Sequence, residues 1–168
     1  MTDTSDQLIV ITFDGEYGLL GIRPKEIAVA TVGPNIATWT AHIQHDNANN
    51  NLPPMARHQN DYLQKFCQCL TRDYGKIPLE TALQSIKQFV HTRTRIITKG
   101  AEQAFILTHL LQVKVQNSQD LYPNLNKNIT STITCTAPVH YKLPIKFTCA
   151  TNRAVRLAKQ LHNFVPTK

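Results

Sequence analysis

Two carboxylates separated by one glycine stand at the end of an apolar stretch near the N-terminus. The stretch reads LIVITFDGEYG, and its acids are Asp14 and Glu16. Residues two apart on a β-strand face the same side, so both carboxylates could hold one divalent cation. Hard oxygen ligands of this kind suit Mg²⁺ or Mn²⁺. The alternative is a solvated strand end that leads into a turn.

The elements that would position these acids begin with three strands. QLIVITF is a continuous apolar run, typical of a strand covered on both faces. The segments EIAVATVG and IATWTAHIQ follow it, divided by the turn signal GPN. Their short connections predict an antiparallel meander.

Beyond the polar loop HDNANNNLPP, the apolar period becomes that of helices. We expect helices in NDYLQKFCQCLTRDYG, IPLETALQSIKQFV (with Pro78 in its first turn), AEQAFILTHLL and CATNRAVRLAKQLHNFV. Further strands are expected in RTRIITKG and VKVQNSQDL. The aromatic residues expected in the core are Trp39, Phe66, Phe89 and Phe105.

The predicted order is therefore β-β-β-α-α-β-α-β-α, in a single domain over residues 1–168. Antiparallel strands followed by alternating helices and strands imply an α/β protein with a mixed sheet and helices on both faces. We expect a five-stranded mixed sheet with the strand Leu8–Phe13 in its interior.

This order, together with FDGEYG, resembles the DEDD exonucleases of the ribonuclease H-like superfamily. The first motif of that family is an Asp-x-Glu at the end of the first strand, which Asp14 and Glu16 match. The resemblance implies a ribonuclease H-like sheet. It also implies two divalent ions roughly 4 Å apart that activate water for phosphodiester cleavage.

The remaining motifs of the family depart from its pattern. In AEQAFIL, Glu102 lies one position from the expected second acid and Gln103 occupies that position; alternatively, Glu102 is a first-turn acid that favours the helix dipole. In TCATNRAV, Thr148 stands at the expected His and Arg153 at the expected Asp. An arginine would repel a metal cation, and Thr148 cannot take a proton from water near neutral pH.

A more specific resemblance is to a divergent branch of exonuclease-like proteins of arthropod genes, mobile elements and large DNA viruses. It rests on KG followed by Glu, on DYGKIP, and on a Cys-x4-His pattern followed by CA. Cys135, His140 and Cys149 carry the last pattern. They offer three zinc ligands where a structural site wants four, and the alternative is buried free cysteines with a surface histidine.

The charge of the chain favours a polyanionic partner. Its 168 residues carry 18 Lys and Arg against 11 Asp and Glu, a formal charge of +7. The candidates for nucleic-acid contacts are Arg93, Arg95, Lys99 and Arg153, although a solvated basic surface explains them equally well. No apolar run approaches the roughly 18 residues of a membrane span. The polar start MTDTSDQ predicts no signal peptide, hence a cytoplasmic or nuclear location, or a virion.

The sequence therefore predicts an exonuclease-derived domain with a degenerate active site, in which Asp14, Glu16 and Glu102 are the ancestral catalytic acids. It would act by binding nucleic acid or protein, in a viral or mobile-element setting, and would need no cofactor. One alternative is a working 3′–5′ exonuclease that uses Mg²⁺ or Mn²⁺. Another is a viral structural or assembly protein. The oligomeric state is left open.

Overall fold

The computed structural model describes residues 7–18, 21–44, 53–62, 77–90, 93–123 and 150–164. The strands are β1 (Gln7–Gly18), β2 (Gly21–Thr31), β3 (Thr38–Gln44), β4 (Ile77–Pro78), β5 (Thr94–Thr98) and β6 (Val115–Asn117). The helices are α1 (Pro54–Tyr62), α2 (Leu79–Phe89), α3 (Ala101–Leu111), α4 (Ser118–Leu121) and α5 (Ala150–Phe164). In the described part of the chain, no helix is long and apolar enough to span a bilayer.

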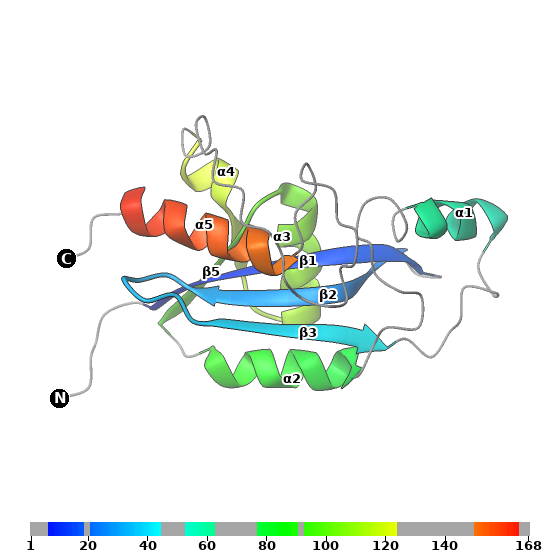
Figure 1. Ribbon diagram of the computed structural model, residues 1–168, viewed down its shortest axis with the longest axis horizontal. Helices are drawn as coiled ribbons and strands as arrows, with labels where there is room; N and C mark the ends of the chain where they lie inside the picture. The colour runs from blue at the N-terminus through cyan, green and yellow to red at the C-terminus, as the bar shows by residue number, and fades with distance from the viewer. Residues whose placement is uncertain are drawn as a thin grey trace.

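The six strands form one mixed sheet in the order β4-β3-β2-β1-β5-β6 (Figure 1). β1 pairs antiparallel with β2 and parallel with β5, and β2 pairs antiparallel with β3. The predicted meander and the interior position of the first strand are thus confirmed. The expectation of five strands is wrong, because Ile77 and Pro78 add a short edge strand parallel to β3.

Side chains of β1 alternate between two hydrophobic cores, as the period of a strand requires. Ile9, Ile11 and Phe13 belong to a cluster with α2 and α3. Val10 belongs to a second cluster, which α5 covers from the opposite face of the sheet. Figure 1 shows α5 and α2 on opposite sides of the strands. The expected mixed α/β sheet with helices on both faces is therefore present.

Helix α5 packs on the sheet through small residues. Ala150, Ala154 and Ala158 are fully buried, and they face a cluster that includes Ala28 and Ala30 of β2. Leu157 and Leu161 complete the buried side of α5, as its apolar stripe predicts. With methyl groups on both surfaces, the helix backbone can approach the strands closely.

Several segments differ from the expectation. α1 begins at Pro54 rather than Asn60, and the rest of that predicted helix lies outside the described residues. The predicted strand VKVQNSQDL is shortened to β6 because Asn117 caps α4, its side chain accepting from the backbone N–H of Gln119 at 3.1 Å. Phe89 and Phe105 are 48% and 77% exposed, so their core assignment is wrong. The following residues also lie outside the described ranges: Phe66, Cys135, His140, Thr148 and Cys149.

Candidate functional site

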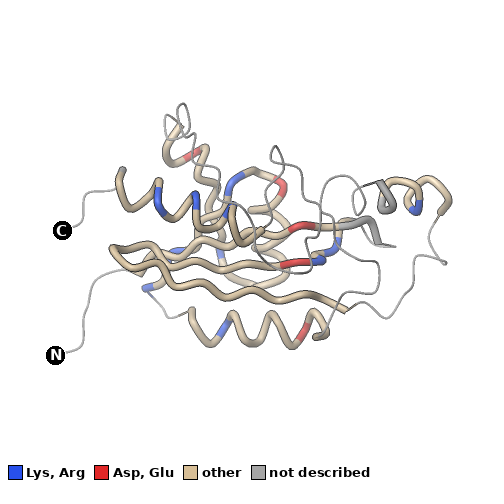
Figure 2. The backbone as a smooth tube through the Cα atoms, viewed as in Figure 1, with Lys and Arg blue, Asp and Glu red and all other residues tan. Residues whose placement is uncertain are grey.

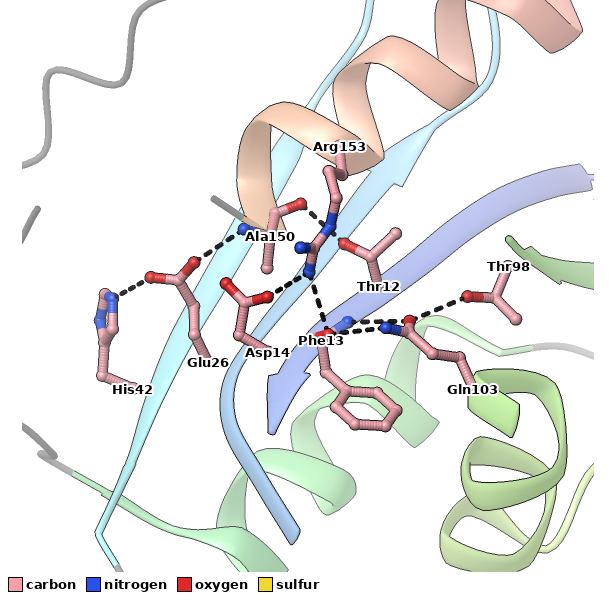
Figure 3. A network of polar contacts seen from close by, with 9 residues as sticks. All are labelled: Thr12, Phe13, Asp14, Glu26, His42, Thr98, Gln103, Ala150 and Arg153. Carbon is pink, nitrogen blue, oxygen red and sulfur yellow. Dashed lines mark hydrogen bonds and ion pairs between the residues drawn. The ribbon is translucent and has the colours of Figure 1, made fainter. Parts of the chain in front are cut away.

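A row of three polar residues crosses the centre of the sheet beneath the start of α5. Asp14 of β1 is the register partner of Glu26 of β2, and Glu26 is the register partner of His42 of β3. The His42 imidazole Nε2 lies 2.8 Å from Glu26 Oε2 (Figure 3). Asp14 is 7% exposed and Glu26 1% exposed. Two carboxylates are thus buried on neighbouring strands, where each needs a partner.

The first turn of α5 is fixed to this part of the sheet by one side chain from each of three strands. Glu26 Oε1 accepts from the backbone N–H of Ala150 at 2.9 Å. The Thr12 hydroxyl donates to the Ala150 carbonyl at 2.7 Å, and the Thr40 and Thr151 hydroxyls are 2.7 Å apart. Glu26 therefore satisfies one of the N–H groups that a helix N-terminus leaves without an intrahelical partner.

Arg153, one turn further along α5, supplies the cation for Asp14. Its Nη2 lies 2.5 Å from Asp14 Oδ1 and 3.0 Å from the carbonyl oxygen of Phe13 (Figure 3). The Arg153 side chain is 35% exposed and that of Asp14 9%. A guanidinium keeps its charge at every pH that a protein tolerates. The buried carboxylate is therefore neutralised by a permanent cation of the chain itself.

Gln103 of α3 completes the edge of β1 on the other side of Asp14. Its Nε2 donates to the Phe13 carbonyl at 2.8 Å, and the Phe13 N–H donates to its Oε1 at 3.3 Å. The pairing of β1 with β5 ends at Val10, so the Gln103 amide takes the place of a strand residue opposite Phe13. The adjacent Glu102 is exposed and lies in the first turn of α3.

Gly15, between the two acids, is required by close packing. A Cβ at this position would lie 2.6 Å from Ile22 Cγ2 and 3.2 Å from the Arg23 carbonyl oxygen. The β1–β2 register shifts between Asp14 and Gly15, where the pairing skips Lys25 of β2, as in a β-bulge or a related irregularity. β1 therefore continues through Asp14 and Glu16, and the acids do not mark its end. The side chain of Glu16 lies outside the described part of the structure.

The residues expected to contact nucleic acid lie in two settings. Arg93, Arg95 and Lys99 are exposed around β5. Arg95 donates through Nε and Nη2 to Gln116 Oε1 of β6, at 3.3 and 3.1 Å. Arg153 is bound to Asp14 and keeps about a third of its side chain exposed.

The described side chains around Asp14 do not provide the donor set of a divalent-cation site. Within the described ranges, no group of three or more His, Cys, Asp or Glu residues is placed to share a metal ion. One oxygen of the Asp14 carboxylate, Oδ1, is bonded to the Arg153 guanidinium. A cation at bonding distance of that oxygen would meet a like charge and would have to displace Arg153.

Glu26 and His42 are site residues that sequence reasoning missed. Glu26 opens the apolar run EIAVATVG, where an acid reads as a solvated strand start. The available signal was its position: it opens the second predicted strand, which must pair with the strand that carries Asp14. Two acids that lie directly opposite each other on paired strands repel, so each is expected to have a partner that offsets its charge.

Solved structures of 3′-exonucleases share this fold at 12% sequence identity. The first shows 3′-end specific recognition of a histone mRNA stem-loop by a 3′-exonuclease; it has a TM-score of 0.56 and covers 95% of this chain. The chain spans 63% of the length of that exonuclease. The second is the nuclease domain of 3′hExo, a DEDDh family member, bound to rAMP, with a TM-score of 0.57 and coverage of 98% of this chain and 94% of that one.

Neither a protein-family model nor a curated protein matches the chain. The structural likeness shows the fold, and the chain has the ribonuclease H-like, exonuclease-like architecture expected from its element order.

Proposed function

We propose that this protein is an exonuclease-derived domain that has lost metal-dependent cleavage and acts by binding nucleic acid. The observation that carries the first half is the 2.5 Å contact between Arg153 Nη2 and Asp14 Oδ1. Two-metal hydrolysis needs several carboxylates that offset the charge of the ions and fix their spacing. Here the best-placed carboxylate is held by a cation of the protein.

The second motif supports the same conclusion. Gln103, at the position where the family resemblance expects an acid, is a neutral amide engaged with both backbone groups of Phe13. The neighbouring Glu102 is an exposed first-turn acid. Of the acids at the family's motif positions, Asp14 and Glu16 therefore remain, and Asp14 is already neutralised by Arg153. Catalytic use of Asp14, Glu16 and Glu102 is ancestral in this proposal.

The nucleic-acid half of the proposal rests on charge. The chain carries a formal charge of +7, and exposed basic residues surround β5. Such residues contact phosphates and release counterions without reading bases. Binding should therefore be tolerant of sequence and should weaken steeply as salt is raised.

The decisive experiment is a nuclease assay on single-stranded DNA and RNA with Mg²⁺ or Mn²⁺. We expect no hydrolysis beyond that of an Asp14→Ala preparation purified in parallel, because a contaminating nuclease would appear in both. Metal-dependent hydrolysis that disappears in Asp14→Ala would overturn the proposal and establish an active 3′–5′ exonuclease. Absence of binding to DNA and RNA even at low salt would remove nucleic acid as the partner and favour an assembly role.

A further inference from the structure

One of the two layers that cover the sheet carries a net positive charge. Arg95 shares its face of β5 with Ile97, which belongs to the core under α5. α5 adds Arg156 and the exposed Lys159, and none of its 15 residues is acidic. Figure 2 shows blue and no red positions along α5. We call the outer surface of α5 and β5 the cationic face.

The acids on this side of the sheet do not cancel its charge. Asp14 and Glu26 are buried and bonded to groups of α5. Within the described parts of β5, β6, α4 and α5, Asp120 is the acidic residue, and it is exposed. The opposite layer is close to neutral, since α2 carries Glu80 and Lys87, α3 carries Glu102, and the exposed Lys114 closely follows α3.

Exposed aromatic side chains lie on that opposite layer. The large apolar side chains that are exposed in the described structure are Met55, Phe89, Phe105 and Val113. Phe89 belongs to α2 and Phe105 to α3. Near the cationic face, Tyr122 packs against the core under α5. Single-stranded nucleic acids are bound through exposed aromatic rings on which bases stack, whereas phosphates need only cations.

We infer that the cationic face binds the phosphate backbone of a nucleic-acid duplex, at a surface separate from the Asp14 region. A duplex presents a high density of phosphates and keeps its bases stacked. Such a partner suits the described part of the cationic face, which has basic side chains and no fully exposed ring. The Arg95 guanidinium is already oriented by its two bonds to Gln116. This inference rests on the proposed nucleic-acid function and adds the form of the partner and its surface.

The test measures fluorescence anisotropy with a labelled duplex of about 20 base pairs and with its single strand, between about 50 and about 200 mM salt. We expect tighter binding of the duplex. The double variant Arg95→Glu/Lys159→Glu should weaken duplex binding at least about tenfold at low salt and lower the salt slope by about 2, one for each lost phosphate contact. Arg95→Gln/Lys159→Gln should give an intermediate loss with less risk to folding.

Lys87→Glu on α2 is the matched control, because it reverses one charge on the opposite layer and should leave duplex affinity unchanged. Tighter binding of the single strand, or an equal loss in Lys87→Glu, would overturn the duplex inference while leaving nucleic-acid binding in place. If the unmodified protein binds neither the duplex nor the single strand, the proposed nucleic-acid function is wrong, and this inference fails with it.

Discussion

Asp14 and Glu26 are direct register partners on adjacent antiparallel strands, and α5 supplies a different partner to each. Asp14 receives the Arg153 guanidinium, and Glu26 receives the backbone N–H of Ala150. Two carboxylates in this position would repel each other. The two carboxylates of the sheet therefore depend on α5 for their partners, and substitutions in either the sheet or the helix should lower the free energy of unfolding.

Arg153→Ala should lower the free energy of unfolding by about 1 to 3 kcal/mol, because it leaves the Asp14 carboxylate buried without its guanidinium. We expect a loss at the lower end of that range, because the Arg153 side chain is 35% exposed and solvent weakens its ion pair. Urea denaturation followed by circular dichroism measures the change. Lys159→Ala, an exposed change on the same helix, should stay within about 0.5 kcal/mol. Equal losses in the two variants would contradict the ion pair.

Glu26→Ala should cost more stability than Glu26→Gln. The glutamine keeps an oxygen that can accept from Ala150, whereas alanine leaves that N–H and the His42 ring without their acceptor, a loss of about 2 to 4 kcal/mol. Denaturant titrations of both variants supply the comparison. Indistinguishable midpoints would show that the Glu26 contact contributes nothing to docking of α5.

Gln103→Ala should destabilise the protein by about 1 to 2 kcal/mol, because both the N–H and the carbonyl of Phe13 lose a bond to the amide. Glu102→Ala, one residue away and exposed, should change stability by less than about 0.5 kcal/mol. Thermal unfolding of the pair of variants decides which side chain of this turn supports β1. The reverse order of effects would assign that role to Glu102.

Gly15→Ala should cost about 1 to 3 kcal/mol, since the new methyl group would meet Ile22 Cγ2. Gly33→Ala is the control, because a Cβ there has no neighbour within 4 Å. In the Gly15→Ala background, the second change Ile22→Ala should restore part of the lost stability, because it removes the Cγ2 atom that the new methyl group would meet. Additive losses in this double variant would argue that the β-bulge, not the contact, demands glycine.

The sequence was sufficient where a periodic pattern coincides with burial. The continuous apolar run of β1 and the stripe of Ala154, Leu157, Ala158 and Leu161 on α5 predicted an interior strand and a packed helix. Phe105 was misassigned because α3 is apolar on most sides, so its pattern does not identify the face that meets the sheet. The two-residue β4 is too short to have a period.

The polar network could not be read from local patterns. Glu26 and Ala150 are 124 residues apart, and Phe13 and Gln103 are 90 apart. An amide or a strand-start acid has no distinctive spacing, and its role depends on which distant backbone group reaches it. Only the first motif, Asp-x-Glu on a central strand, combined local spacing with topology strongly enough to indicate a site.

The anchoring of α5 has a consequence for folding order. Its contacts with Thr12 and Asp14 join residues 138 and 139 positions apart, so they close very long loops. The β1–β2–β3 meander is local and can pair while α5 is still unformed. During that interval the two neighbouring carboxylates lack their helix partners and weaken the nascent sheet. Docking of α5 should therefore be a late, rate-limiting step, and slowing it would prolong exposure of the alanine-lined face to aggregation.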